Sequence, residues 1–186
     1  MFEGPDLPDP QFSSTGVSSY DADSETLSSF PSPQNPEGDL YLRFFVESGE
    51  EFALAAMGIR EVLSVVPEQI TPVPNVSPLL MGVFNFRGQV IWISDVGQFL
   101  GGTRLLNTER TEIPIIVIES QDVMVGLAGE RVRGMEWLNL DALTPSSSHS
   151  TDSMTPFLKG EWQGISEKPL RLLDPTSILR SARWAA

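Results

Sequence analysis

The stretch VFNFRGQVIWI, residues 83–93, decides the fold class. Residues 83–86 and 90–93 are short runs rich in β-branched and aromatic side chains, which favour strands. Arg87, Gly88 and Gln89 lie between these runs, and a glycine lets the chain turn directly. We therefore predict two strands joined by a tight turn. If the first strand is regular, Arg87 shares a face with Val83 and Asn85.

The same pattern recurs along most of the chain. Short apolar runs separated by turn-forming residues are typical of an all-β sandwich or barrel. The other predicted strands cover residues 40–46, 52–55, 59–66, 115–118, 123–128, 132–138, 157–162 and 169–173. Two short helices are predicted at residues 95–100 and 175–183, with Asp95 and Asp174 as N-caps. We therefore expect a folded domain over residues 40–183.

The first 39 residues have a different composition. They hold 8 acidic and no basic residues, together with 8 serines and 6 prolines. Their scattered apolar side chains follow neither a helical nor a strand period, so they bury too little apolar area to offset the entropy of ordering a chain. We predict a disordered acidic tail over residues 1–39. A short partner-binding motif around Leu27 and Phe30 is the alternative.

Composition excludes several classes of function. The chain of 186 residues has a net charge of −13, no cysteine and one histidine, His149. Nucleic acid is not an expected partner, because a phosphate-binding face needs clustered positive charge. Thiolate and multi-histidine metal sites are excluded by the same counts. No apolar run reaches the roughly 18 residues of a membrane span, and no signal peptide is recognisable. We therefore expect a cytoplasmic protein without direct membrane insertion.

The search for catalytic motifs finds neither a P-loop, a dinucleotide-binding glycine motif, a zinc-protease motif nor a serine-nucleophile motif. No cofactor and no catalytic residue are predicted. Carboxylate pairs exist, Glu50 with Glu51 and Glu119 with Asp122, but both fall in predicted turns. They leave open one alternative, a small carboxylate-using enzyme on a β-barrel fold. That alternative requires a deep pocket lined by acids with shifted pKa values.

One charged residue interrupts an apolar strand face. In the predicted strand 59–66, Ile59, Leu63 and Val65 share a face with Glu61. A carboxylate in such a place needs a cation or hydrogen bonds, and Arg87 is the candidate cation. The pair is either a structural salt bridge or a charged anchor on a protein-binding face, and spacing alone favours the structural role.

Seven motifs in order make the chain resemble the CheW family of chemotaxis coupling proteins. The family's patterns V-x-E-V, T-P-x-P-N, G-x-x-N-x-R-G and a strand ending in Asp-Leu are matched by IREV, ITPVPN, GVFNFRG and ISDV. Its patterns V-G-L-x-V-D-x-V, F-x-K-G and L-L-D…L-L are matched by VGLAGERV, FLKG and LLD…IL. Each motif alone is weak, whereas seven in order, from about residue 40 to residue 182, are specific.

The resemblance implies an all-β fold of two SH3-like five-stranded barrels with short helices. It also implies a non-catalytic adaptor without cofactor, which bridges the cytoplasmic tip of a methyl-accepting chemotaxis receptor and the regulatory domain of a CheA-type histidine kinase. Such an adaptor is recruited to membrane receptor arrays. The family's receptor-contact positions correspond to Ile59, Glu61, Arg87, Val132 and Met135, with the partner-binding candidates Pro114 and Ile115 nearby, and its motif positions include Asn85 and Gly88. An ordinary core position is the alternative for Ile115, Val132 and Met135.

The chain also departs from the family pattern. Glu130 stands where the family has Asp, Val96 where it has Leu, and Gly134 where an acid is common. Arg131 and Arg133 make the surroundings of Val132 more basic. From these departures we hypothesise a chemotaxis-like pathway for motility by type IV pili rather than flagella, and the sequence leaves both pathways open.

Overall fold

A computed structural model describes residues 38–146 and 153–185. The predicted acidic tail up to residue 37, with Leu27 and Phe30, lies outside the described residues, and so does His149. The first strand begins at Asp39, next to the predicted start of the folded domain.

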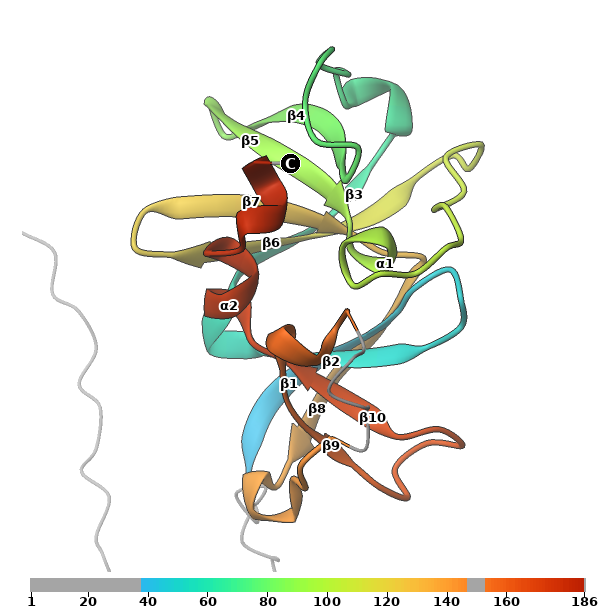
Figure 1. The fold of residues 1–186 in the computed structure, drawn as a ribbon, viewed down its shortest axis with the longest axis vertical. Helices are drawn as coiled ribbons and strands as arrows, with labels where there is room; N and C mark the ends of the chain where they lie inside the picture. The colour runs from blue at the N-terminus through green and yellow to red at the C-terminus, as the bar shows by residue number, and fades with distance from the viewer. Residues whose placement is uncertain (1–37, 147–152, 186) are drawn as a thin grey trace, which may run out of the picture. The chain divides into compact units, whose positions relative to one another are not determined.

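Among the described residues, ten strands form two five-stranded sheets, so the all-β prediction is confirmed (Figure 1). The first sheet has the order β8 (Arg131–Leu138), β1 (Asp39–Phe45), β2 (Glu51–Ala55), β10 (Leu170–Leu173) and β9 (Leu158–Trp162). The second has the order β3 (Ile59–Val65), β6 (Ile113–Ser120), β7 (Val123–Ala128), β5 (Gln89–Asp95) and β4 (Leu80–Phe86). The chain crosses to the second sheet after β2 and returns with β8, so the second sheet is one continuous piece of sequence, from β3 to β7, while the first combines strands from both ends of the fold.

Both predicted N-caps are confirmed. Asp95 caps α1 (Val96–Phe99) by accepting hydrogen bonds from the amides of Gly97 and Gln98. Asp174 caps α2 (Pro175–Leu179) through the amide of Thr176. The predicted C-terminal helix is shorter than expected, because the chain continues from α2 into a separate 3-10 turn, η5 (Ala182–Ala185). The other 3-10 turns are η1 (Ala56–Gly58), η2 (Pro67–Gln69), η3 (Leu140–Ala142) and η4 (Thr155–Phe157).

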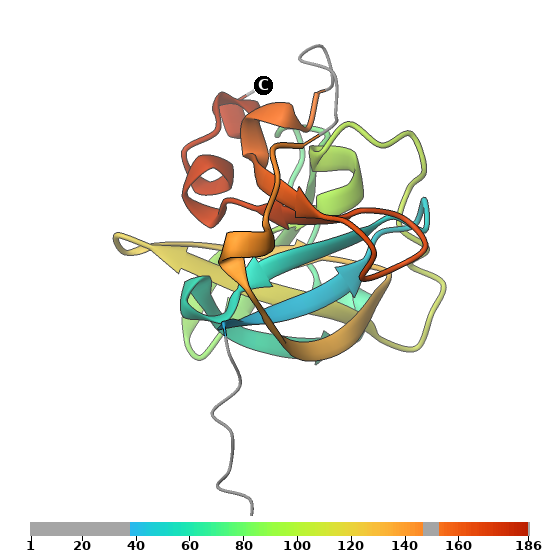
Figure 2. The same cartoon turned by 90° about the horizontal axis from the view of Figure 1, so that it is seen from below.

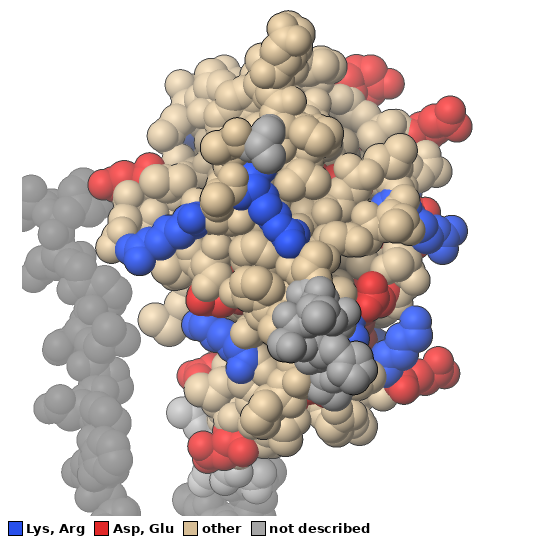
Figure 3. All heavy atoms as spheres, in the orientation of Figure 1, with Lys and Arg blue, Asp and Glu red and all other residues tan. Residues whose placement is uncertain are grey.

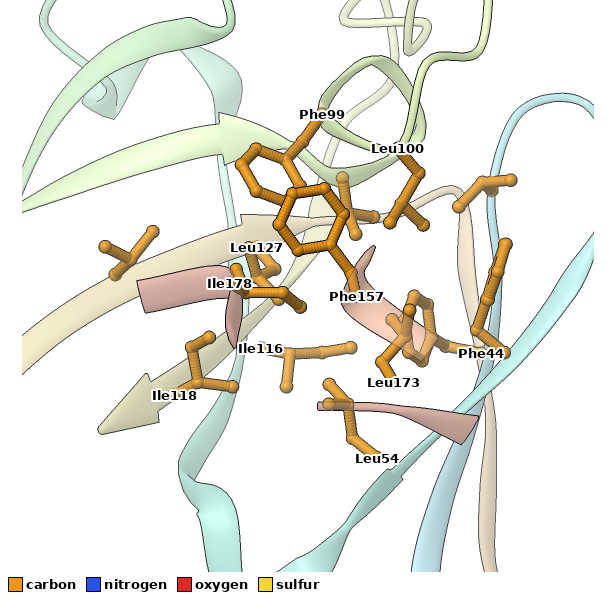
Figure 4. Packing of buried hydrophobic residues seen from close by; sticks show 14 of the residues in the cluster. Phe44, Leu54, Phe99, Leu100, Ile116, Ile118, Leu127, Phe157, Leu173 and Ile178 are labelled. Carbon is orange, nitrogen blue, oxygen red and sulfur yellow. The ribbon is translucent and has the colours of Figure 1, made fainter. Parts of the chain in front are cut away.

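Within the described ranges, buried hydrophobic side chains form three clusters. One lies within the first sheet and includes Tyr41 and Trp162, and one lies within the second and includes Ile93 and Ile115. The third and largest lies between the sheets and combines side chains from β1, β2, β6 and β7 with those of α1 and α2 (Figure 4). The two helices cover this shared core from the same side of the sheets (Figure 2). Burial of apolar surface between the sheets therefore holds the two barrels together.

Candidate functional site

The turn after β4 has a different geometry from the one predicted. Phe86 pairs directly with Gln89, so the turn consists of Arg87 and Gly88 alone. Both residues have positive φ, 52° and 83°, as a type I′ hairpin turn requires. Arg87 therefore does not continue the strand face of Val83 and Asn85, and that prediction was wrong. The predicted role of Gly88 in the turn is confirmed.

Asn85 supports this turn. Its Oδ1 accepts a hydrogen bond of 2.9 Å from the amide of Gly88. A side chain that bonds the backbone a few residues ahead stabilises a turn locally. The spacing Asn85-x-Arg87-Gly88 thus holds the Arg87 side chain at one place on the surface.

The predicted pairing of Glu61 and Arg87 is confirmed. The predicted common face of Ile59 and Glu61 is wrong, because a register shift pairs Ile59 with Ile118 on the side of the shared core and Glu61 with Val117 on the side of the second sheet's core. Arg87 Nη2 lies 2.6 Å from Glu61 Oε2, and the side chains are 68% and 32% exposed for Arg87 and Glu61. Glu61 belongs to β3 and Arg87 follows β4, and these strands are the two ends of the second sheet's order. The ion pair therefore spans the place where the second sheet curls round on itself, and it remains accessible to a partner.

Removal of this ion pair is expected to change stability little. We expect Arg87→Ala to lower the free energy of unfolding by about 0.2–1 kcal/mol, because water screens an exposed pair. Urea denaturation of the variant beside the unmodified protein measures this difference. A loss of about 3 kcal/mol or more would show instead that the pair is a structural element of the buried kind.

Ile59 and Val132 both pack against the core that the two sheets share. Both are half-buried, and they belong to β3 and β8. These strands are end strands of their sheets, so each has one edge without a neighbouring strand in its own sheet. We call the surface formed by Ile59, Val132, Met135 and Trp137 the seam surface.

A β-bulge brings Met135 onto the same face as Val132. The β1–β8 register shifts so that Phe44 pairs with Val132 while Arg43 pairs with Gly134, which leaves Arg133 as the extra residue. Directly paired antiparallel residues project to one side, so Val132 and Met135 share the side of Phe44 and Leu42. Met135 is 49% exposed.

Two exposed apolar residues were missed by sequence reasoning. Trp137 pairs with Leu40, lies two residues beyond Met135 and is 50% exposed. The sequence did contain a signal for Trp137, because residues two positions apart on a strand point to the same face. Met57 is fully exposed in η1, where the chain passes from the first sheet to the second. Nothing in its sequence neighbourhood distinguishes it.

Ile115 does not lie on the surface. Its side chain is 0% exposed and belongs to the core of the second sheet, so its predicted contact with a partner is corrected. The reason is the position of β6: Ile115 and Val117 face the core of the second sheet while Ile116 and Ile118 face the shared core. Pro114, the neighbouring candidate, is half-buried and pairs with Ser64 of β3.

A buried cluster of charges in the first sheet was also missed. Arg43 is 2% exposed and forms two hydrogen bonds of 2.9 Å with the carboxylate of Glu51, which is itself buried. Arg43 also bonds Glu136 and Ser166. Burial alone would raise the pKa of Glu51, but the hydrogen bonds from Arg43 and Ser166 hold that pKa below its ordinary value. The signal for this cluster was one arginine inside the apolar run 40–46.

The pockets do not resemble a carboxylate-based active site. Among the described residues, the main apolar hollow is an open groove of about 440 Å³ whose lining includes Trp92 and Trp184 but no carboxylate. A smaller hollow contains Glu50 and Glu51, but Arg171 and Arg43 pair with these acids. In the described ranges no group of three potential metal ligands occurs. A helix able to cross a membrane is likewise not found in the part of the chain that is described.

A sequence profile of the CheW-like domain matches residues 41–183, nearly all of the described fold. The chain belongs to the CheW-like domain family. It is 30% identical to "Protein PilI" of Pseudomonas aeruginosa over 131 aligned residues, and this aligned region covers 70% of each chain. It is 29% identical over 124 residues to "Probable chemotaxis protein CheW" of Rhizobium etli, which covers 67% of this chain and 77% of the relative.

A solved structure shows the same fold. The scaffolding protein TtCheW of Thermoanaerobacter tengcongensis superposes with a TM-score of 0.65 at 20% sequence identity, over 78% of this chain and 95% of that one. The expected architecture of the CheW-like family is therefore confirmed.

Several motif residues of this CheW-like domain have structural roles. A Cβ on Gly82 would lie 2.3 Å from the carbonyl oxygen of Thr71, where an isolated bridge between Thr71 and Val83 joins the loop after η2 to β4. Asp95 not only caps α1 but also accepts a hydrogen bond of 2.9 Å from the amide of Leu106. The motifs thus specify turns, caps and close approaches of the backbone, while the seam surface and the Glu61–Arg87 pair remain available for binding.

Proposed function

We propose that this CheW-like protein is a non-catalytic adaptor that couples methyl-accepting chemotaxis receptors to a CheA-type histidine kinase. Membership of the family supports this function, and so do relatives named for chemotaxis and a solved relative described as a scaffolding protein. The observation that carries the proposal is the seam surface with the accessible Glu61–Arg87 pair nearby. The work of the protein is then binding alone, in the cytoplasm at membrane receptor arrays.

We assign the receptor tip to the seam surface. Half-buried apolar side chains give a contact area that is already ordered, so little side-chain entropy is lost on binding. The charged pair at its margin supplies orientation and discrimination between partners more than affinity. The kinase regulatory domain is assigned to a different part of the surface, since an adaptor has to hold both partners at once.

Co-purification with two baits tests this proposal. The full chain is mixed with receptor cytoplasmic tips or with kinase regulatory domains from the same genome. The variants are Glu61→Arg, Arg87→Glu, the double charge swap and Met135→Lys. We expect each single variant to weaken receptor binding at least about tenfold, because the partner contacts these side chains directly. We expect the double swap, which restores an ion pair within the chain, not to restore binding.

The chain contains a matched control. Arg60 and Glu119 form another exposed ion pair between β3 and β6, at 3.6 Å, with 57% and 33% of the side chains exposed. Arg60→Glu changes the same charge as Arg87→Glu on the same barrel and is expected to leave receptor binding intact. Loss of binding in this control, or absence of binding to both baits by the unmodified chain, would contradict the proposal.

The pathway remains part of the proposal. The relatives include "Protein PilI" at 30% identity and "Probable chemotaxis protein CheW" at 29%, so their names support pilus-based motility and chemotaxis to a similar degree. Deletion of the gene, followed by assays of twitching and of swimming, distinguishes the two pathways.

A further inference from the structure

The open apolar groove of the second sheet has no part in the proposed receptor contact. It has a volume of about 440 Å³ and lies between β4, β5, β7 and the C-terminal turns. Trp92 on β5 is 37% exposed and Val123 on β7 is 50% exposed. Leu80 and Val125 add to its apolar lining, and Leu179 and Trp184 form its C-terminal side. An exposed apolar hollow of this kind marks a binding site for an apolar partner.

The C-terminal wall of the groove is fixed in place. The ring of Trp184 stacks on Phe99 with 4.4 Å between the centroids. Its indole N–H donates a hydrogen bond of 2.8 Å to the carbonyl oxygen of Ile178. Because both contacts are with residues of the folded core, the groove exists before any partner binds.

Two arginines, Arg180 and Arg183, lie at the C-terminal margin of the groove. Arg180 follows the groove residue Leu179 and donates a hydrogen bond of 2.8 Å to the amide oxygen of Gln121, in the turn before Val123. Arg183 bonds the carbonyl oxygens of Phe99 and Ser153. Within residues 38–146 and 153–185, neither arginine forms an ion pair with a carboxylate. In the space-filling view, basic side chains lie over the C-terminal turns amid mostly uncharged surface (Figure 3).

The chain itself contains a segment of the complementary chemistry. Asp21, Asp23 and Glu25 are followed by Leu27 and Phe30, and no basic residue occurs in the first 39 positions. Acidic side chains next to two apolar ones match an apolar groove with arginines at its margin. This segment ends before the described residues begin at position 38.

We propose that residues 21–30 of one copy of the chain bind the groove of a second copy. Leu27 and Phe30 enter the apolar groove, and the acidic residues lie beside Arg180. We take a second copy as the source because only eight steps of chain, at most about 29 Å, separate Phe30 from Gly38, and Gly38 lies beside Leu138 of the first sheet whereas the groove belongs to the second. Gly38 precedes β1 at the end of the first sheet remote from β5 and the C-terminal turns (Figure 1).

A peptide titration tests the contact directly. In the described part of the chain, every strand and every buried cluster residue lies between residues 39 and 179, and Trp184 packs against the shared core, so residues 36–186 contain all of these elements. This fragment, with ¹⁵N-labelled tryptophan, is titrated with a peptide of residues 18–33. We expect the indole signals of Trp92 and Trp184 to shift and saturate, while those of Trp137 and the buried Trp162 stay in place. A Leu27→Ala, Phe30→Ala peptide should bind at least about tenfold more weakly.

Two matched variants distinguish a specific contact between the peptide and Arg180 from a general attraction between the acidic peptide and any arginine. Arg180→Glu should weaken peptide binding about tenfold, while Arg104→Glu, on an exposed loop between α1 and β6, should not. Equal weakening by both variants would overturn the proposal. So would a shift confined to Trp137, which would place the peptide on the seam surface, or the absence of any saturable shift.

The full chain provides the second measurement. Sedimentation at increasing concentration should show self-association that the double substitution Leu27→Ala, Phe30→Ala removes. A full chain that stays monomeric at every concentration would overturn the exchange between copies. Receptor and kinase binding are measured on other variants, so failure of this contact and failure of the adaptor function are distinguishable.

Discussion

The substitution Arg43→Met is expected to lower the free energy of unfolding by about 3–5 kcal/mol. Arg43 is almost fully buried and neutralises Glu51 through two hydrogen bonds of 2.9 Å. Loss of the guanidinium would leave a buried carboxylate without its main counter-charge. Chemical denaturation at pH 7, followed by intrinsic fluorescence, measures the change.

The free energy of unfolding of Arg43→Met should change with pH in the opposite direction to that of the unmodified protein. In the unmodified protein, Arg43 and Ser166 outweigh burial and keep the pKa of Glu51 below its ordinary value of 4.5. Its contribution to stability is therefore present above about pH 4.5 and is lost as the pH falls through the lower pKa of the folded state. Without Arg43, burial raises that pKa, so the variant should recover part of its lost stability between pH 7 and pH 5.

Arg133→Met is the matched control. Arg133 also faces Glu51, at 3.5 Å, but its side chain is 50% exposed. We expect this variant to lose no more than about 1 kcal/mol, because water screens the contact. If the two variants lost the same small amount of stability, the assignment of Arg43 as the main counter-charge would be wrong.

The substitution Phe99→Ala is expected to lower the free energy of unfolding by a similar amount, about 3–5 kcal/mol. Phe99 is fully buried at the end of α1. Its ring lies 4.7 Å from that of Phe157 and 4.4 Å from that of Trp184, measured between centroids. The substitution would leave a cavity where α1 meets the C-terminal turns.

Denaturation and tryptophan fluorescence measure this second effect. Phe99→Leu is the control, since it retains apolar volume and should cost clearly less than alanine. We expect the alanine variant also to change the fluorescence of the native state, because Trp184 loses its stacking partner. A loss below about 1 kcal/mol would indicate that the core refills the cavity and that Phe99 does not hold the C-terminal turns.

Local signals in the sequence predicted the elements and their ends. Asp95 and Asp174 precede apolar residues in the pattern of N-caps, and both cap helices. Gly88 indicated a turn, and the turn is there. These features depend on residues only a few positions apart, whose steric and hydrogen-bonding preferences act in any chain. The pairing of Glu61 with Arg87 was also predictable, because a carboxylate on an apolar face needs a counter-charge.

Features that depend on contacts between distant strands were not predictable in the same way. From the sequence, Ile115 was equally compatible with a core position and with an interface. It lies in the core because both faces of β6 are buried. Arg43 could not be recognised as a buried cation without Glu51, Glu136 and Ser166 around it. Each of these outcomes depends on which side chains from distant strands the fold places next to the residue.

The sequence alone determined the all-β class, the succession of strands along the chain, the caps and the family motifs, because alternating side chains and turn residues act over short distances. Only the tertiary structure decided which faces meet. Val132 and Met135 are three residues apart and would point to opposite sides of a regular strand, yet the bulge at Arg133 puts them on one face. That register is set by pairing with β1, almost ninety residues earlier in the chain, and no local preference of β8 encodes it.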